Sequence, residues 1–187
     1  MSNRKLLGDY IELCEERNDK GEYGEDSVRG IATSKELITT KANLEGVSLT
    51  SYKVVQPGDF AYVPDTTRRG DKMSLGRNEE TAPVLVSSIS CVFRVKDHDV
   101  LDPDYLSMLF RRPEFDRYAR FHSWGSAREA FSYADMCRVK IPLPPIQVQH
   151  AIVSVFQAAR RAKLIAWRAT HLSRNVCPAL IQKAINS

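Results

Sequence analysis

The sequence predicts an α+β fold: a mixed α/β domain followed by a long C-terminal helix of the coiled-coil type. Three observations predict this class. β-prone runs occupy residues 52–63 and 84–95, proline-led helical segments follow from Asp102, and a heptad pattern begins at Val148. Strands followed by helices are typical of α+β domains, and apolar residues spaced alternately by four and three are typical of coiled coils.

In the N-terminal half, short strands alternate with polar turns. The sequence predicts that Tyr52–Val55 and Phe60–Val63 pair as a hairpin. Between them, Pro57 presets φ and Gly58 tolerates a positive φ, as a turn requires. The polar segment 64–82 predicts one long loop. The remaining expectations are a short strand or turn at 5–13, a loop at 14–26, a strand at Val28–Ala32 and no assignable element at 33–50.

In the C-terminal half, prolines mark the element boundaries. Val84–Val86 and Ser90–Val95 are β-prone and predict strands. Asp102 is followed by proline, which together give a favourable N-cap and first helical residue. Pro113 ends this helix and opens the next one. A last strand is expected at 138–143, where further prolines stop it.

The final segment carries the clearest pattern in the chain. Apolar residues recur at a and d positions over about three and a half heptads, so a partner helix is needed to bury them. Alanines in the middle of this seam allow a close approach. Pro178 is expected to end or kink the helix. The residues of the helix seam are Val148, Ile152, Val155, Ala159, Ala162, Ala166 and Ala169.

The charge is distributed unevenly along the chain. The net charge is +4, yet no Asp or Glu occurs from Met136 to the end. Because every charged side chain in that segment is basic, the segment favours a phosphate backbone or an acidic protein surface as a partner. Its basic residues are Arg138, Lys140, Arg160, Arg161, Lys163, Arg168, Arg174 and Lys183.

The chain is expected in the cytoplasm. No apolar run reaches the roughly 18 residues that span a bilayer, so no membrane contact is expected. The N-terminus lacks the apolar core of a signal peptide. Four widely spaced cysteines predict reduced thiols rather than a disulfide framework or a zinc site. They are Cys14, Cys91, Cys137 and Cys177.

The sequence predicts a non-catalytic protein without a cofactor. It lacks the G-x-S-x-G, G-x-x-x-x-G-K-[ST] and G-x-G-x-x-G motifs of hydrolases and nucleotide-binding enzymes. It also lacks the N-P-P-[FYW] motif of amino methyltransferases. The PD…(D/E)xK pattern of nucleases is absent as well, because no Asp or Glu stands two residues before a lysine. No two histidines are four residues apart, so no metal site is predicted.

What remains is recognition, and three regions carry hydrogen-bond donors. The first is the basic loop Thr67–Arg77, for which the alternative is a solvated loop without a partner. The second is the loop His122–Arg128, in which Trp124 either stacks on a ligand or packs inward. The third is a helical cluster of arginines, for which the alternative is a solvated face paired with Glu114 and Asp116. This cluster contains Arg111, Arg112, Arg117 and Arg120.

Five segments resemble the specificity subunits of type I restriction–modification enzymes, and they follow the family's order. The first four are Y-K-V-V-Q-P-G-D-F-A-Y-V-P at 52–64, V-F-R-V-K at 92–96, Y-L-S-M-L-F-R-R-P-E-F-D-R-Y-A at 105–119 and H-S-W-G-S-A-R at 122–128. The fifth is I-P-L-P-P-I-Q-V-Q-H-A-I-V at 141–153. It resembles the junction between a target-recognition domain and its conserved helix, and it is the most specific of the five.

The resemblance implies a non-catalytic DNA sequence-specificity subunit. Residues 1–145 would form a DNA target-recognition domain that reads one half of a bipartite site. Residues 146–187 would form the conserved helical arm, which packs against another such helix and docks the methyltransferase (modification) subunit. Double-stranded DNA and the modification subunit are the implied partners, and a restriction subunit is a further one.

Within the implied recognition domain, DNA contacts are placed by loop and not by a matched motif. The expected DNA-binding residues are Arg68, Arg69 and Lys72 in the first loop, and Ser123, Gly125, Ser126 and Arg128 in the second.

The chain departs from the family pattern in one respect. Members commonly carry two recognition domains and two conserved helices, and this chain has room for one of each. A half-length subunit that forms a homodimer is favoured over a fragment, because the helix seam needs a partner to bury it. The competing interpretation is a stand-alone dimeric DNA-binding regulator.

Overall fold

The computed structural model divides into two compact units, Met1–Gln149 and His150–Ser187. The predicted α+β class with a long last helix is confirmed. The structure describes residues 4–65, 72–124 and 129–185, with the backbone alone at 175–181 and 183–185. Within these ranges, no helix is both long enough and apolar enough to cross a membrane.

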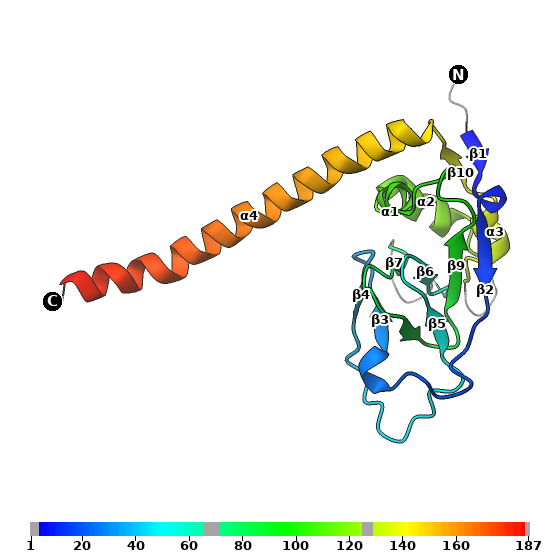
Figure 1. The fold of residues 1–187 in the computed structure, drawn as a ribbon, viewed down its shortest axis with the longest axis horizontal. Helices are drawn as coiled ribbons and strands as arrows, with labels where there is room; N and C mark the ends of the chain where they lie inside the picture. The colour runs from blue at the N-terminus through cyan, green and yellow to red at the C-terminus, as the bar shows by residue number, and fades with distance from the viewer. Residues whose placement is uncertain (1–3, 66–71, 125–128, 186–187) are drawn as a thin grey trace. The chain divides into compact units, whose positions relative to one another are not determined.

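Figure 1 labels the elements in chain order. The strands are β1 (Arg4–Leu6), β2 (Ile11–Cys14), β3 (Arg29–Ile31), β4 (Leu37–Thr39), β5 (Lys53–Val55), β6 (Phe60–Tyr62), β7 (Leu75–Arg77), β8 (Val84–Val86), β9 (Cys91–Val95) and β10 (Lys140–Pro142). The α-helices are α1 (Pro103–Phe110), α2 (Pro113–Phe121), α3 (Tyr133–Cys137) and α4 (Ile146–Ile185). Short 3-10 helices occur at Leu7–Asp9 and Glu25–Ser27.

The core of the first unit is an antiparallel sheet in the order β2-β9-β6-β7. Phe60 on β6 lies opposite Phe93 on β9, and their rings stack with centroids 5.2 Å apart. Phe110 from α1 meets Phe60 edge-on at 5.7 Å. All three side chains are buried, and burial of each contributes roughly 1.5–3 kcal/mol. These contacts hold α1 against the sheet, with α2 next to it (Figure 1).

The hairpin predicted at residues 52–63 is wrong, although its turn is correct. The Asp59 amide donates to the Gln56 carbonyl at 3.0 Å, and Gly58 has a φ of 88°. However, β5 pairs with β8, whereas β6 pairs with β7 and β9. Every residue of β5 and β6 is buried, so contacts with the surrounding core decide which strand each of them pairs with. Packing in the core outweighs the local preference for a hairpin.

The loop predicted at 64–82 contains a strand, and that part of the prediction is wrong. β7 pairs with β6, and Gly76 lies opposite Ala61. A Cβ on Gly76 would lie 2.7 Å from the carbonyl carbon of Glu36 and 2.8 Å from the amide nitrogen of Leu37. Glycine therefore allows β4 to approach β7 closely. The same glycine weakens the sequence signal for a strand, which is why β7 was not predicted.

Both predicted helix starts are confirmed. The Asp102 carboxylate accepts a hydrogen bond from the Tyr105 amide at 2.8 Å and caps α1, and Pro113 opens α2. α3 was not predicted. It is capped by Ser132, whose hydroxyl oxygen accepts from the Asp135 amide at 3.1 Å. Its five residues are too few to show a helical period in the sequence.

β1 and β10 pair antiparallel, so residues 4–6 lie alongside residues 140–142. Sequence patterns predicted strand character in both places but not the pairing. The side chain of Gln149 links the segment before α1 to the residues that lead into α4. Its fully buried side-chain amide donates to the carbonyls of Val100 at 2.9 Å and Pro144 at 2.8 Å, while its oxygen accepts from the Asp102 amide at 3.0 Å.

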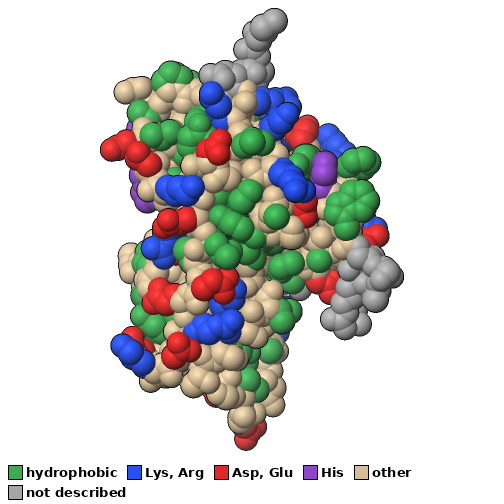
Figure 2. Space-filling view, turned by 90° about the vertical axis from the view of Figure 1, so that its right-hand side faces the viewer, with side chains coloured by type: hydrophobic (Ala, Val, Ile, Leu, Met, Phe, Trp, Pro, Cys, Tyr) green, Lys and Arg blue, Asp and Glu red, His purple; other side chains and the backbone are tan. Residues whose placement is uncertain are grey.

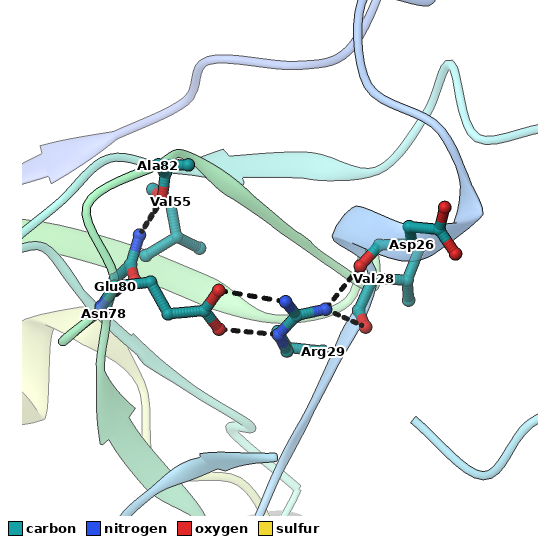
Figure 3. A network of polar contacts seen from close by, with 7 residues as sticks. All are labelled: Asp26, Val28, Arg29, Val55, Asn78, Glu80 and Ala82. Carbon is teal, nitrogen blue, oxygen red and sulfur yellow. Dashed lines mark hydrogen bonds and ion pairs between the residues drawn. The ribbon is translucent and has the colours of Figure 1, made fainter. Parts of the chain in front are cut away.

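A polar network ties the segment after β7 to the first residue of β3 (Figure 3). The buried Asn78 amide donates to the carbonyls of Val55 and Ala82, both at 2.9 Å. The Arg29 guanidinium donates two parallel hydrogen bonds to the Glu80 carboxylate, at 2.7 and 2.9 Å. This Arg29–Glu80 pair lowers the pKa of Glu80, because hydrogen bonding favours the ionised carboxylate.

α4 runs from Ile146 to Ile185, so the alternative in which Pro178 ends it is wrong, and a kink at Pro178 stays a prediction. A proline inside a helix removes one backbone hydrogen bond and costs about 3 kcal/mol.

Candidate nucleic-acid interface

The structure brings together the stems of the two loops that the sequence nominated for DNA binding. Asp65, just before the first loop, and Trp124, within the second, both form antiparallel bridges with Ala130. The Trp124 amide donates to Ala130 at 3.2 Å, and the Ala130 amide donates back at 3.0 Å. The Phe131 amide donates to the Pro64 carbonyl at 2.9 Å. The two loop regions, which are far apart in the sequence, are thus joined at Ala130 and Phe131.

Most of the residues expected to bind DNA lie outside the described ranges. They are Arg68, Arg69, Gly125, Ser126 and Arg128. The two that are described differ in exposure. Lys72 is exposed, and no acidic side chain in the described part of the chain pairs with it. Ser123 is buried, and its hydroxyl donates to the Ala119 carbonyl at 2.7 Å, so it also stabilises the end of α2. Their DNA contacts stay predictions.

A buried ion pair anchors the first loop at Met73. Lys35 and Asp116 form this pair, and Lys35 also donates to the Met73 carbonyl at 2.7 Å. The Asp116 carboxylate accepts from the Met73 amide at 3.0 Å. Lys35 further lies over the Phe115 ring, with its ammonium 5.5 Å from the ring centroid. The backbone of Met73 is therefore held through both its donor and its acceptor.

Burial is the main influence on the charge of Lys35. It lowers the pKa of this ammonium, and the Asp116 carboxylate opposes that shift. Lys35 also has a φ of 67°, a left-handed conformation that non-glycine residues seldom adopt. Sequence reasoning missed this pair, because Lys35 lies in the stretch 33–50 where no element was assigned. No local pattern distinguishes it from the other lysines.

Exposed aromatic side chains flank the loop stems. Phe121 is 74% exposed and Trp124 is 67% exposed. The alternative in which Trp124 packs inward is therefore wrong. Between them, the His122 ring stacks on Tyr118 with centroids 3.9 Å apart. Exposed aromatic rings beside donor-rich loops offer stacking surfaces for bases or sugars.

The arginine cluster on the helices is largely ion-paired, as its alternative interpretation expected. Asp116 is not one of the partners, because it is occupied by Lys35. The pairs are Arg111 with Glu36 at 3.6 Å and with Glu79 at 3.8 Å, Arg112 with Glu114 at 3.3 Å, Arg117 with Glu114 at 3.5 Å, and Arg120 with Glu129. Figure 2 shows basic and acidic side chains interspersed over the face of the molecule that it draws.

All seven residues of the helix seam that the sequence predicted are exposed; Val148 belongs to the first unit and the other six to the second. Larger apolar side chains are exposed outside the seam as well. They are Leu164, Ile165, Trp167 and Leu172. The apolar surface of α4 is therefore broader than the predicted seam, a feature that the strict a/d pattern overlooked.

The described residues contain no group of three His, Cys, Asp or Glu side chains that could hold a metal ion. Cys14, Cys91 and Cys137 are free thiols. Burial raises the pKa of Cys91 to about 11 and also raises that of Cys14. A thiol with a raised pKa is a poor nucleophile and a poor metal ligand at neutral pH.

The fold is that of the type I specificity subunits. The chain matches the HsdS subunit from Thermoanaerobacter tengcongensis with a TM-score of 0.68 and 19% identity, over 97% of this chain and 48% of that one. It matches a chain from a structure on complex assembly and conformational transition of the type I R-M system with a TM-score of 0.64 and 20% identity, over 98% and 48%.

A third similar structure is the type I restriction–modification S subunit from M. genitalium. Its TM-score is 0.53 at 14% identity, over 88% of this chain and 40% of that chain. The fold implied by the sequence resemblance is thereby confirmed, and the chain spans about half the length of the first two structures. Neither a scan of protein-family models nor a search of curated proteins gave a match.

Proposed function

We propose that this chain is the DNA sequence-specificity subunit of a type I restriction–modification system. The observation that carries the proposal is the fold, which follows two type I structures over 97% and 98% of this chain. In this proposal, residues 1–145 recognise one half of a bipartite DNA site. The chemistry on DNA belongs to other subunits, and this chain is not an enzyme.

The DNA-reading surface would lie at the joined loop stems. Asp65, Trp124 and Ala130 form one backbone ladder there, so described residues of both loop regions meet at one place. Base contacts would come from the loops themselves, and Trp124 supplies an exposed ring beside them. A bidentate arginine such as Arg128 is well suited to read guanine.

The helical arm, residues 146–187, would pair with a second copy of this chain and dock the modification subunit. The exposed helix seam supports this, because apolar a and d side chains on one helix are stabilised when a partner helix covers them. A pair of identical arms around a two-fold axis would place two identical recognition domains on DNA. The expected target is therefore a symmetric, interrupted sequence.

Two measurements test this proposal. Selection of bound duplexes from a random library should return an interrupted palindrome, and pull-down from the native cell extract should recover a methyltransferase subunit carrying N-P-P-[FYW]. DNA binding without such a subunit would favour the stand-alone regulator instead. Absence of any DNA binding, with the modification subunit present, would contradict both interpretations.

The arm is tested separately. Val155→Glu together with Ala162→Glu puts two charges on the helix seam and should convert a dimer into a monomer by light scattering, with the circular dichroism of the first unit unchanged. Arg160→Glu with Lys163→Glu is the matched control, because these exposed residues lie outside the seam. A wild-type chain that stays monomeric at tens of micromolar, alone and with DNA, would rule out the homodimer.

A further inference from the structure

A hollow of about 690 Å³ lies in the first unit between the β3–β4 turn and α2. Among the lining residues that the structure describes, five are basic and Asp116 is the one acid. We call it the basic hollow. Its lining consists of Thr33, Ser34, Lys35, Lys72, Arg111, Pro113, Asp116, Arg117, Arg120 and Phe121.

The charge of Asp116 is already balanced inside the protein. Its carboxylate pairs with Lys35 and accepts from the Met73 amide at 3.0 Å, and its side chain is 12% exposed. Arg111 is likewise committed to the structure, since it pairs with Glu36 and donates to the Ser34 carbonyl at 3.2 Å. Asp116 is therefore not free to repel an anion strongly, whereas Arg111 keeps a buried Nη2 that has no hydrogen-bond partner in the described part of the chain.

The cations at the rim are the groups available to a ligand. Lys72 is exposed and has no acidic partner among the residues that the structure describes. Arg117 is 71% exposed, and its pair with Glu114 at 3.5 Å spans one helical turn, a contact that contributes little in water. Arg120, paired with Glu129, is the third rim cation. An anion entering the basic hollow would meet these donors from two different segments.

We propose that the basic hollow binds a backbone phosphate of duplex DNA, with Lys72 and Arg117 as its direct donors. This inference rests on the proposed function. The location argues for DNA over a free anion, because Lys72 lies in the first loop and Phe121 closes α2 just before the second. The site assigns Lys72 to the sugar–phosphate backbone and leaves base reading to the other residues of the two loops. Phosphate contacts of this kind fix the register of a protein on the duplex without reading sequence.

The test measures duplex affinity against salt for the full chain carrying Lys72→Gln and Arg117→Gln. Each lost phosphate contact lowers the slope of log affinity against log salt by about 0.9. The deficit of the double variant relative to wild type should therefore be roughly twelvefold larger at 50 mM than at 200 mM salt. It should also be equal for two duplexes of unrelated sequence. Fluorescence anisotropy with labelled duplexes gives both numbers.

Arg138→Gln is the matched control. Arg138 is 74% exposed and forms an i,i+3 pair with Asp135 at 3.3 Å, much like Arg117 with Glu114, but it lines a separate hollow beside β10. Its slope should stay near that of wild type. An equal loss in Arg138→Gln and Arg117→Gln would mean general attraction by net charge and would overturn the proposal.

Other outcomes are decisive as well. A deficit that differs between the two duplexes would make Lys72 or Arg117 a base contact and overturn the phosphate assignment. Inorganic phosphate binding that depends on these residues, with duplex binding unchanged, would assign the hollow to free phosphate. If wild type binds DNA and the double variant matches it, only this inference fails. If wild type binds no duplex at all, the proposed function fails with it.

Discussion

Two ion pairs in the first unit perform similar tasks in different surroundings. The Lys35–Asp116 pair joins the β3–β4 turn to α2, with side chains that are 5% and 12% exposed. The Arg29–Glu80 pair joins β3 to the segment after β7, with side chains that are 18% and 45% exposed. The first pair also holds the Met73 backbone on both its amide and its carbonyl.

The difference concerns cost. A buried ion pair loses much of its Coulomb energy to desolvation, whereas its breakage leaves an uncompensated charge in the interior. A pair near the surface costs little to form and contributes little. The buried Lys35–Asp116 pair, which costs more to form, holds Met73 in the loop predicted to bind DNA. The backbone of Met73 is thus fixed by two side chains, Lys35 and Asp116, that cannot easily rearrange.

The largest expected effect is from Asp116→Ala. It leaves the Lys35 ammonium buried without its partner and should lower the free energy of unfolding by about 3–5 kcal/mol. Urea denaturation measures this. The double change Lys35→Met with Asp116→Leu is the control, because an apolar pair removes both charges and should recover most of the loss. A loss below about 1 kcal/mol in the single variant would show that water reaches the site.

A smaller effect is expected from Asn78→Ala, next to the more exposed pair. The buried Asn78 amide satisfies the carbonyls of Val55 and Ala82, and its removal should cost about 2–3 kcal/mol in the same measurement. Asn43→Ala provides the comparison, since Asn43 bonds only the exposed Glu45 amide. Equal losses in the two variants would contradict the view that burial decides the cost.

Glu80→Gln should have a smaller effect again. It removes the charge that Arg29 faces at a partly exposed site, so the loss should be below about 1 kcal/mol in low salt. Because salt screens exposed charges, the difference from wild type should vanish near 1 M NaCl. The loss in Asp116→Ala should persist there. Identical salt dependence of the two variants would remove the distinction between the pairs.

The smallest effect is in the pH dependence of that same difference. Arg29 holds the pKa of Glu80 below its usual value of 4.5, so the pair stabilises the fold above that pH. The contribution should disappear as the pH falls through the lower value of the folded state. Wild type and Glu80→Gln should therefore converge in stability toward acid. Divergence toward acid would show that the pKa of Glu80 is raised instead.

Local chemistry made part of this structure predictable. Asp102 with the following proline, and Pro113, mark helix starts whose capping depends on neighbouring residues alone. The period of the helix seam likewise predicted α4, although not its passage through Pro178. The two loops were nominated because glycine, polar residues and donors cluster there in the sequence, but the bridges that join their ends were not predicted.

Long-range choices were not predictable from the sequence. β5 takes β8 as its partner and not the nearer β6, a choice made by burial of both strands. Lys35 and Asp116 are separated by 81 residues, so neither residue signals the other. Gly76 is needed for the close approach of β4, and it hides the strand that contains it. In each case the deciding contact comes from another part of the fold.

The pairing of β1 with β10 has a consequence for the chain during its synthesis on the ribosome. A ribosome adds about 5–20 residues per second, so residues 4–6 wait on the order of ten seconds for residues 140–142 to emerge. During that time β1 is an open edge able to pair with another chain. Its sequence, Arg-Lys-Leu, is short and carries two positive charges. Such an edge resists pairing with its own kind, which protects each nascent chain until its last strand arrives.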